Sequence, residues 1–258
     1  VNIEKKHKLI DYYDEIRRYA KVEWENLYYN SRIIDSLILQ EARERKIVLP
    51  SRSYSKKEEG ESFKGAYRMA ETGLFHNVYK ADLSSAYPTS MVDFCLDSCN
   101  AGKEGLKINK YFFKQEKTLL PSLTEKLINL KEKLKEKKKS NPELQRKYNA
   151  YKGLVNSVFG TTAYKSFRIF DLRVSSTITF LVRDLLHYVE EKLKEENASI
   201  IYIDTDSVMY QADRDLTDKL NELVKKWGKE KYNKDVTMRF DSEGKFKSIL
   251  ILGKCHYY

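Results

Sequence analysis

The chain has 258 residues, a formal net charge of +10 and 41% hydrophobic residues, a composition typical of a folded protein with a basic surface. Such a surface favours polyanionic partners. No apolar run approaches the roughly 20 residues that a bilayer requires, and the first residues lack the apolar core of a signal peptide. We therefore expect a soluble intracellular protein. Cys95, Cys99 and Cys255 predict neither a disulfide framework nor a complete zinc site.

The N-terminal third contains one strong helical pattern and one exposed connection. An apolar stripe at near-helical spacing predicts helices within residues 9–46, through Ile33, Ile34, Leu37, Ile38 and Ala42. Pro50 and the polar run 51–60 predict an exposed connection. The sequence Phe63-Lys64-Gly65-Ala66 then has the small residues of a turn that a phosphate chain could approach.

Residues 78–91 have the pattern of a strand followed by a helix. Val78 to Asp82 resembles a strand that ends in a carboxylate, and Pro88 is typical of a helix start. Helix-opening amides beside an acidic strand end would suit a metal-bound phosphate. An ordinary strand-to-helix corner is the alternative.

Two facing helices are predicted between Phe112 and Phe159. Leucines spaced by three and four, after a capping-box sequence at residues 122–125, indicate the first helix: Leu120, Leu123, Leu127, Leu130 and Leu134. Residues 140–142 predict the turn, and the return helix repeats the spacing with Leu144, Tyr148, Tyr151, Val155 and Val158. Lys152 and Asn156 share one side of the return helix, where a solvated basic face and a polyphosphate site are both compatible with the pattern.

The C-terminal part is predicted to begin with a long helix, residues 175–196, ended by Asn197. Residues 201–210 predict a hairpin with Asp204 and Asp206 at its tip. Two carboxylates so close together favour a shared hard cation such as magnesium, although aspartates also simply favour turns. A further helix at 214–228 and strands at 236–240 and 248–252 complete the pattern.

Three blocks in this order resemble the motifs of family B DNA polymerases. Residues 82–89, Asp-Leu-Ser-Ser-Ala-Tyr-Pro-Thr, are similar to D-x-x-S-L-Y-P-S. Residues 152–160, Lys-Gly-Leu-Val-Asn-Ser-Val-Phe-Gly, are similar to K-x-x-x-N-S-x-Y-G, and residues 202–207, Tyr-Ile-Asp-Thr-Asp-Ser, to Y-G-D-T-D-S. Residues 63–66 also resemble the family's Y-x-G-G/A turn, and residues 254–257 its K-K-x-Y element, with Cys255 in place of the second lysine.

The resemblance implies a DNA-directed DNA polymerase that adds deoxynucleotides to a primer 3′-hydroxyl by two-metal phosphoryl transfer. It implies Asp82, Asp204 and Asp206 as catalytic carboxylates, which with Leu83 would hold two Mg²⁺ ions, or Mn²⁺ as a substitute. The implied nucleotide-binding residues are Leu83, Ser84, Ser85, Tyr87, Lys131, Lys135, Lys152 and Asn156. The implied DNA-binding residues are Phe63, Gly65, Ala66, Gly160, Lys254 and Tyr257. Tyr87 would exclude a ribose 2′-hydroxyl.

The implied fold class is α+β, a polymerase palm whose antiparallel sheet carries the carboxylates, with a helical-hairpin fingers subdomain. We expect an N-terminal helical segment at residues 1–50, palm at 51–110 and 161–258, and fingers at 111–160. Primer-template DNA and deoxynucleoside triphosphates are the expected partners. A separate chain would supply thumb or exonuclease, and the expected location is cytoplasmic, at a nucleoid or virus-associated replication site. The alternative function is a non-catalytic, nucleic-acid-binding polymerase-like subunit of a replication complex.

Overall fold

The computed structural model describes residues 9–52, 63–138, 141–195 and 198–258. The chain divides into two compact units. The helical unit comprises residues 1–62, 94–107 and 111–175, and the sheet unit comprises residues 63–93, 108–110 and 176–258. Most of the predicted exposed connection at 51–60 lies outside the described residues, as do Ser140 and Asn197. None of the described helices is long and apolar enough to cross a bilayer.

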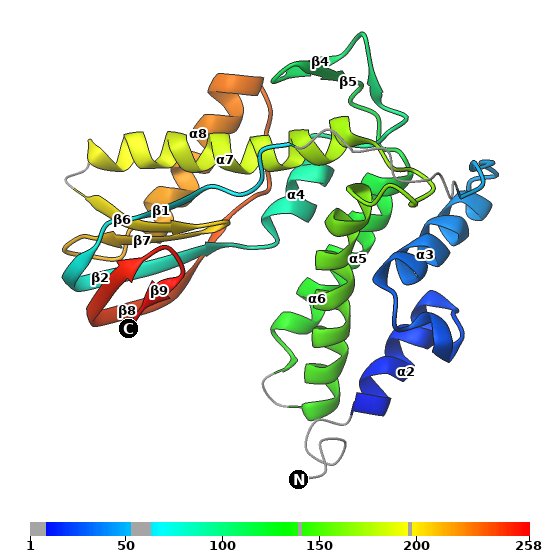
Figure 1. Cartoon of the computed structure of the whole chain (residues 1–258), viewed down its shortest axis with the longest axis horizontal. Helices are drawn as coiled ribbons and strands as arrows, with labels where there is room; N and C mark the ends of the chain where they lie inside the picture. The colour runs from blue at the N-terminus through cyan, green and yellow to red at the C-terminus, as the bar shows by residue number, and fades with distance from the viewer. Residues whose placement is uncertain (1–8, 53–62, 139–140, 196–197) are drawn as a thin grey trace. The chain divides into compact units, whose positions relative to one another are not determined.

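The helical unit contains α2 (Leu9–Ala20), the short 3-10 helix η1 (Trp24–Asn26), α3 (Asn30–Glu44), α5 (Leu119–Lys135) and α6 (Pro142–Thr162). Figure 1 shows α5 and α6 side by side, which confirms the predicted hairpin. The predicted stripe of α3 is buried, and so are Leu127 of α5 and Val155 of α6. Asn141 caps α6, because its side chain accepts a hydrogen bond from the amide of Glu143 at 2.8 Å.

The predicted capping box at residues 122–125 is wrong. Helix α5 already begins at Leu119, so Ser122 and Glu125 lie inside it. The buried carboxylate of Asp97 caps the helix instead, since it accepts hydrogen bonds from the Leu120 amide at 2.9 Å and the Thr118 hydroxyl at 2.8 Å. A side chain distant in sequence thus accepts from a first-turn amide of α5, where no local cap stands.

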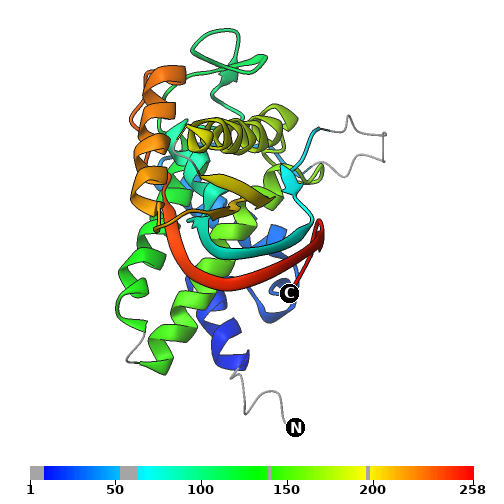
Figure 2. The same ribbon diagram turned by 90° about the vertical axis from the view of Figure 1, so that its left-hand side faces the viewer.

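The sheet unit is built on a six-stranded antiparallel sheet with the order β1-β6-β7-β2-β8-β9. Its strands are β1 (Arg68–Ala70), β2 (Gly73–Leu83), β6 (Ser199–Asp204), β7 (Ser207–Gln211), β8 (Phe240–Gly253) and β9 (His256–Tyr257). Figure 2 shows that the sheet is strongly curled. Fully buried side chains from four strands form a core cluster, which includes Val78, Ile201, Met209 and Ile249.

Three helices complete the sheet unit: α4 (Ala86–Asp93), α8 (Thr217–Tyr232) and the larger part of α7 (Leu172–Lys194). Their positions agree with the predicted helices after residue 84, at 175–196 and at 214–228. The predicted inward side of α7 is buried, as Ile178, Leu185 and Leu193 show. The combination of these helices with an antiparallel sheet confirms the α+β class.

Two details of the sheets differ from the sequence prediction. The strand expected at 248–252 lies within the longer strand β8, whereas the strand expected at 236–240 does not form, because residues 236–239 precede β8 without strand structure. The amides of Thr237 and Met238 donate to the carboxylate of Asp93 at 2.8 and 3.2 Å. The Asp93 side chain thus accepts the hydrogen bonds that a neighbouring strand would accept. A small sheet with the order β3-β5-β4, formed by β3 (Ala101–Gly102), β4 (Leu106–Ile108) and β5 (Tyr111–Phe113), was not predicted.

Candidate functional site

The turn between β6 and β7 carries two of the predicted site residues. Asp204 ends β6 and Ser207 begins β7, so Thr205 and Asp206 form a two-residue turn. Thr205 has a left-handed φ of 64°, which is rare for a β-branched residue. Its amide donates to the carbonyl of Tyr67 at 3.0 Å, and the amide of Asp206 donates to the carbonyl of Asp204 at 2.7 Å. These bonds offset the backbone strain and fix the positions from which both carboxylates extend.

Asp82 reaches the same end of the sheet from the neighbouring strand. It lies opposite Ser207 in the pairing of β2 with β7. The amide of Leu83 donates to the carbonyl of Asp206 at 2.8 Å, which joins the end of β2 to the turn. The fold therefore brings Asp82, Asp204 and Asp206 to one end of the sheet from two segments that are far apart in sequence.

Negative charge at this end of the sheet is only partly compensated. Burial raises the pKa of the Asp206 carboxyl above its usual range, and the charges of Asp204 and Glu243 raise it further. Lys80 lies two residues before Asp82 and forms an ion pair with Glu243 at 2.6 Å, which offsets part of the repulsion. A hard divalent cation would stabilise such carboxylates, so the donor chemistry fits Mg²⁺.

Asp204 already has a cationic partner, Arg68. The Nε atom of Arg68 donates to Oδ1 of Asp204 at 2.7 Å, and the Thr205 hydroxyl donates to the same oxygen at 3.0 Å. Within the described ranges, no three His, Cys, Asp or Glu side chains are grouped so that they could hold a metal ion. The assignment of Asp82, Leu83, Asp204 and Asp206 as metal ligands therefore stays a prediction.

Tyr87 lies close to the carboxylates, at the start of α4. Burial raises the pKa of its phenol, and the negative charge of Asp206 raises it further, while Arg183 and Arg68 act in the opposite direction. The ring is half-buried. The structure thus brings together Tyr87 and the acidic turn, and the position of Tyr87 beneath an incoming sugar stays a prediction.

The expectation that the strand-to-helix amides hold a phosphate does not agree with this structure at two positions. The Leu83 amide is bonded to Asp206, and the Ser84 amide donates to the carbonyl of Arg239 at 2.9 Å. Both bonds are part of the backbone framework that positions the acidic turn. Any contact of Leu83 or Ser84 with a nucleotide would therefore use other atoms of these two residues.

The Phe63–Ala66 turn is held against α7. Arg183 donates to the carbonyls of Lys64 and Gly65, the second at 2.5 Å, and the Thr179 hydroxyl donates to Lys64 at 3.1 Å. At the other edge of the sheet, β9 carries Tyr257, whose ring packs edge-on against Tyr202 with centroids 5.4 Å apart. Lys254 is exposed in the turn that precedes β9.

The remaining predicted residues belong to the helical unit. Lys152, Asn156 and Gly160 are all exposed and stand four residues apart on α6, so they form one stripe along the helix. Lys131 differs, since only 4% of it is exposed and its ammonium lies 3.0 Å from the carboxylate of Glu132. Contact of Lys131 with a phosphate would require a change of this arrangement, whereas Lys135 is partly exposed.

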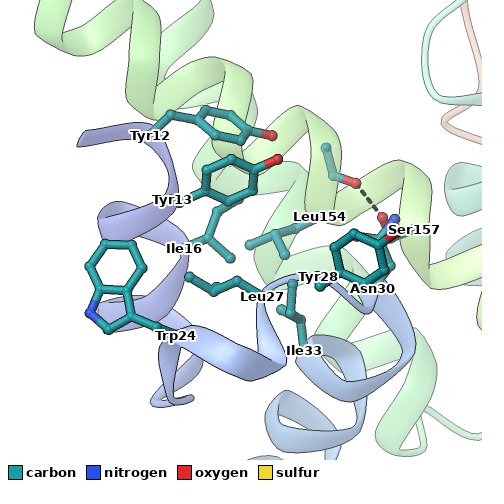
Figure 3. Close-up of a pocket in the computed structure, with 11 residues that line it drawn as sticks. Tyr12, Tyr13, Ile16, Trp24, Leu27, Tyr28, Asn30, Ile33, Leu154 and Ser157 are labelled. Carbon is teal, nitrogen blue, oxygen red and sulfur yellow. Dashed lines mark hydrogen bonds between the residues drawn. The ribbon is translucent and has the colours of Figure 1, made fainter. Parts of the chain in front are cut away.

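The helical unit also contains a pocket of about 570 Å³ among α2, η1, α3 and α6. Figure 3 shows that aromatic side chains surround it, among them Tyr12, Tyr13 and Trp24. Among the described residues that line it there is neither a lysine nor an arginine. The pocket is therefore poorly suited to a phosphate chain.

Sequence reasoning missed Arg68, Lys80 and Arg183. For Lys80 a signal existed, because side chains two residues apart on a strand share a face, and Lys80 stands two before Asp82. Arg68 and Arg183 gave no such signal. Their importance follows from pairings with residues more than a hundred positions away.

Comparison with known proteins identifies the family. The family model described as DNA polymerase family B matches residues 24–258. The chain therefore belongs to DNA polymerase family B.

Two relatives illustrate the similarity. The DNA polymerase of Pyrococcus glycovorans is 24% identical over 194 residues, which cover 68% of this chain and 25% of that protein. The DNA polymerase alpha catalytic subunit of Arabidopsis thaliana is 26% identical over 213 residues, covering 79% of this chain and 14% of the relative. The chain thus spans about a quarter or less of the length of these relatives.

A solved structure supports the same fold. The structure of the family B DNA polymerase from the hyperthermophilic archaeon Pyrobaculum calidifontis matches 97% of this chain and 34% of that chain, with a TM-score of 0.69 and 20% sequence identity. At this identity the match concerns the fold alone.

Proposed function

We propose that the chain is the core of a DNA-directed DNA polymerase, which adds deoxynucleotides to a primer 3′-hydroxyl as a DNA template directs. The observation that carries this proposal is the backbone bond between Leu83 and Asp206, because it brings Asp82 beside the turn of Asp204 and Asp206. Family membership supports the same function. Primer-template DNA and deoxynucleoside triphosphates are the proposed substrates.

Asp82, Asp206, the carbonyl of Leu83 and, as an additional or outer ligand, Asp204 would hold two Mg²⁺ ions, with Mn²⁺ as a substitute. Bound there, such ions would supply activation of the primer hydroxyl and neutralisation of the leaving pyrophosphate. The protein contributes the position of the ligands, which the strained turn at Thr205 and the bonds to Tyr67 and Leu83 fix. Burial, and after it the charge of Asp204, raises the pKa of Asp206, so a cation beside these carboxylates would stabilise the charged form.

Residues 51–110 and 161–258 would act as the palm, and the hairpin at 111–160 as the fingers. Lys152 and Asn156 would bind the nucleotide, assisted by Lys135 and, after release from Glu132, by Lys131. Phe63, Gly65 and Ala66 would contact the DNA together with Gly160, Lys254 and Tyr257. Phosphate contacts carry no base information, so base choice would come from pairing and pocket shape.

Replacement of Lys152 by Ala tests the fingers assignment. A charged hydrogen bond to phosphate contributes about 1.5–3 kcal/mol, so we expect the KM for nucleotide to rise about 10- to 100-fold while affinity for primer-template changes little. Lys133→Ala is the matched control, since Lys133 is an exposed lysine of α5 outside the predicted site. Steady-state kinetics and DNA titrations measure both quantities. Equal effects of the two variants would show that the hairpin is only a solvated basic face.

Replacement of Tyr87 by Ala tests sugar selection. A rigid ring beneath C2′ would clash with a hydroxyl at a cost of about 1–3 kcal/mol, so the variant should use ribonucleotides about 5- to 100-fold better and still use deoxyribonucleotides. Tyr87→Phe keeps the ring and should keep the selection. Side-by-side incorporation assays give the answer. If Tyr87→Ala instead lowers use of both nucleotides together with the melting temperature, the residue is part of the core.

A second candidate function is a non-catalytic, nucleic-acid-binding subunit. The ion pair of Asp204 with Arg68 favours it, because one of the three carboxylates is already occupied. Primer extension and DNA binding by the 258-residue chain distinguish the two functions. Extension that requires Mg²⁺ supports the polymerase, whereas tight DNA binding without extension supports the subunit.

A further inference from the structure

The contact between Arg68 and Asp204 is built into the sheet. The two residues lie opposite each other in the pairing of β1 with β6, so the fold itself places the guanidinium beside the carboxylate. Their side chains are 51% and 31% exposed, and Nε and Oδ1 are 2.7 Å apart. The pair is therefore close, but it remains open to solvent and to a ligand.

Arg68 lies where it would compete with a divalent cation for the carboxylate of Asp204. Asp204 also lies beside Asp206, whose amide donates to the Asp204 carbonyl at 2.7 Å. Arg68 therefore supplies to Asp204 the positive charge that a divalent cation would supply. A guanidinium can also bind a phosphate through two parallel hydrogen bonds, so a polyanionic substrate offers it another partner.

We propose that Arg68 is a positioning residue that holds Asp204 in the absence of substrate and releases it to a divalent cation when a phosphate group binds the guanidinium. This inference rests on the proposed function, since it takes Asp204 as a ligand of that cation. The exchange breaks one ion pair and forms two, without a covalent step. This role of Arg68 also explains why Asp204 contacts an arginine although it lies at the same end of the sheet as the other two carboxylates.

Mn²⁺ binding to the DNA-free protein tests the proposal without any need for activity. Electron paramagnetic resonance of free Mn²⁺ gives the affinity of the parent chain and of Arg68→Gln. Removing the competing charge of an exposed pair should tighten Mn²⁺ binding about two- to fivefold. Arg68→Met should behave in the same way, and Arg68→Lys should stay closer to the parent because it keeps the charge.

Arg173→Gln is the matched control. Arg173 also forms an arginine–aspartate pair at 2.7 Å, with Asp171, its side chain is 43% exposed, and neither residue belongs to the candidate site. Its loss should leave Mn²⁺ affinity unchanged. In folded variants, unchanged or weaker binding by both Arg68→Gln and Arg68→Met would overturn the proposal.

Asp206→Asn separates this proposal from the proposed function. If it weakens Mn²⁺ binding while neither Arg68 variant tightens it, the carboxylate site stands and only the role of Arg68 is wrong. If it has no effect on binding, the metal site itself is wrong and both proposals fail. Circular dichroism confirms the fold of each variant.

Discussion

Asp206→Asn should reduce nucleotide incorporation by about a thousandfold or more while primer-template binding stays nearly the same. The proposed role of the carboxylate is to hold the cations that stabilise the transition state, so its loss affects the chemical step rather than DNA binding. Single-turnover incorporation measures the rate, and a DNA titration measures binding. Asp213→Asn, in an exposed loop outside the site, is the control and should keep the parent rate.

The same substitution should leave the melting temperature unchanged or raise it. Because the pKa of Asp206 is raised in the folded state, its charged carboxylate destabilises the fold. This destabilisation is fully present at pH values above the pKa of the folded state. Asparagine removes the charge and the repulsion with Asp204. An inactive variant with a much lower melting temperature would instead assign Asp206 a structural role, and activity near the parent rate would remove it from the site.

Asp35→Ala should lower the stability of the helical unit by about 3–5 kcal/mol, since it leaves two arginines without their shared carboxylate. Asp35 is 4% exposed. It accepts hydrogen bonds from Arg168 at 2.9 and 3.1 Å, and from Arg52 at 2.7 Å. Arg168 also donates to the carbonyl of Pro50 at 2.5 Å, so the network joins α3 to two segments outside the helices.

Asp14→Ala is the matched control for Asp35→Ala. Asp14 also contacts two arginines, Arg17 at 2.9 Å and Arg18 at 2.6 Å, but both pairs lie along α2 and the Arg18 side chain is 74% exposed. Its loss should cost less than about 1 kcal/mol. Urea denaturation followed by circular dichroism compares the two variants. A similar small loss in both would show that burial adds nothing to the Asp35 network.

Local patterns were sufficient to predict much of the fold. The hairpin at Asp204 and Asp206 follows from strand formers on both sides of an acidic turn, and the α5–α6 pair follows from apolar residues at helical spacing. Both signals lie within short stretches of the sequence. The motifs then predicted Asp82 as the third carboxylate, and the structure brings it to the same end of the sheet.

The errors arose where a long-range contact replaced a local one. Asp97 caps α5 by accepting a hydrogen bond from an amide 23 residues away. Asp93 accepts a hydrogen bond from the amide of Thr237, a residue that was expected to form a strand. The amide of Ser84, predicted to bind phosphate, is bonded to Arg239. Arg68 was missed because its partner, Asp204, is 136 positions further along the chain. No local pattern contains such information.

We propose that this chain copies a template with its own carboxylate site. Single-nucleotide incorporation on four primer-templates that differ only in the first template base tests it most directly. With Mg²⁺ and one deoxynucleotide at a time, the 258-residue chain should add only the complementary nucleotide, and Asp206→Asn should add none at a comparable rate. Absence of incorporation by a folded, DNA-binding parent chain, or addition that ignores the template base, would contradict the claim.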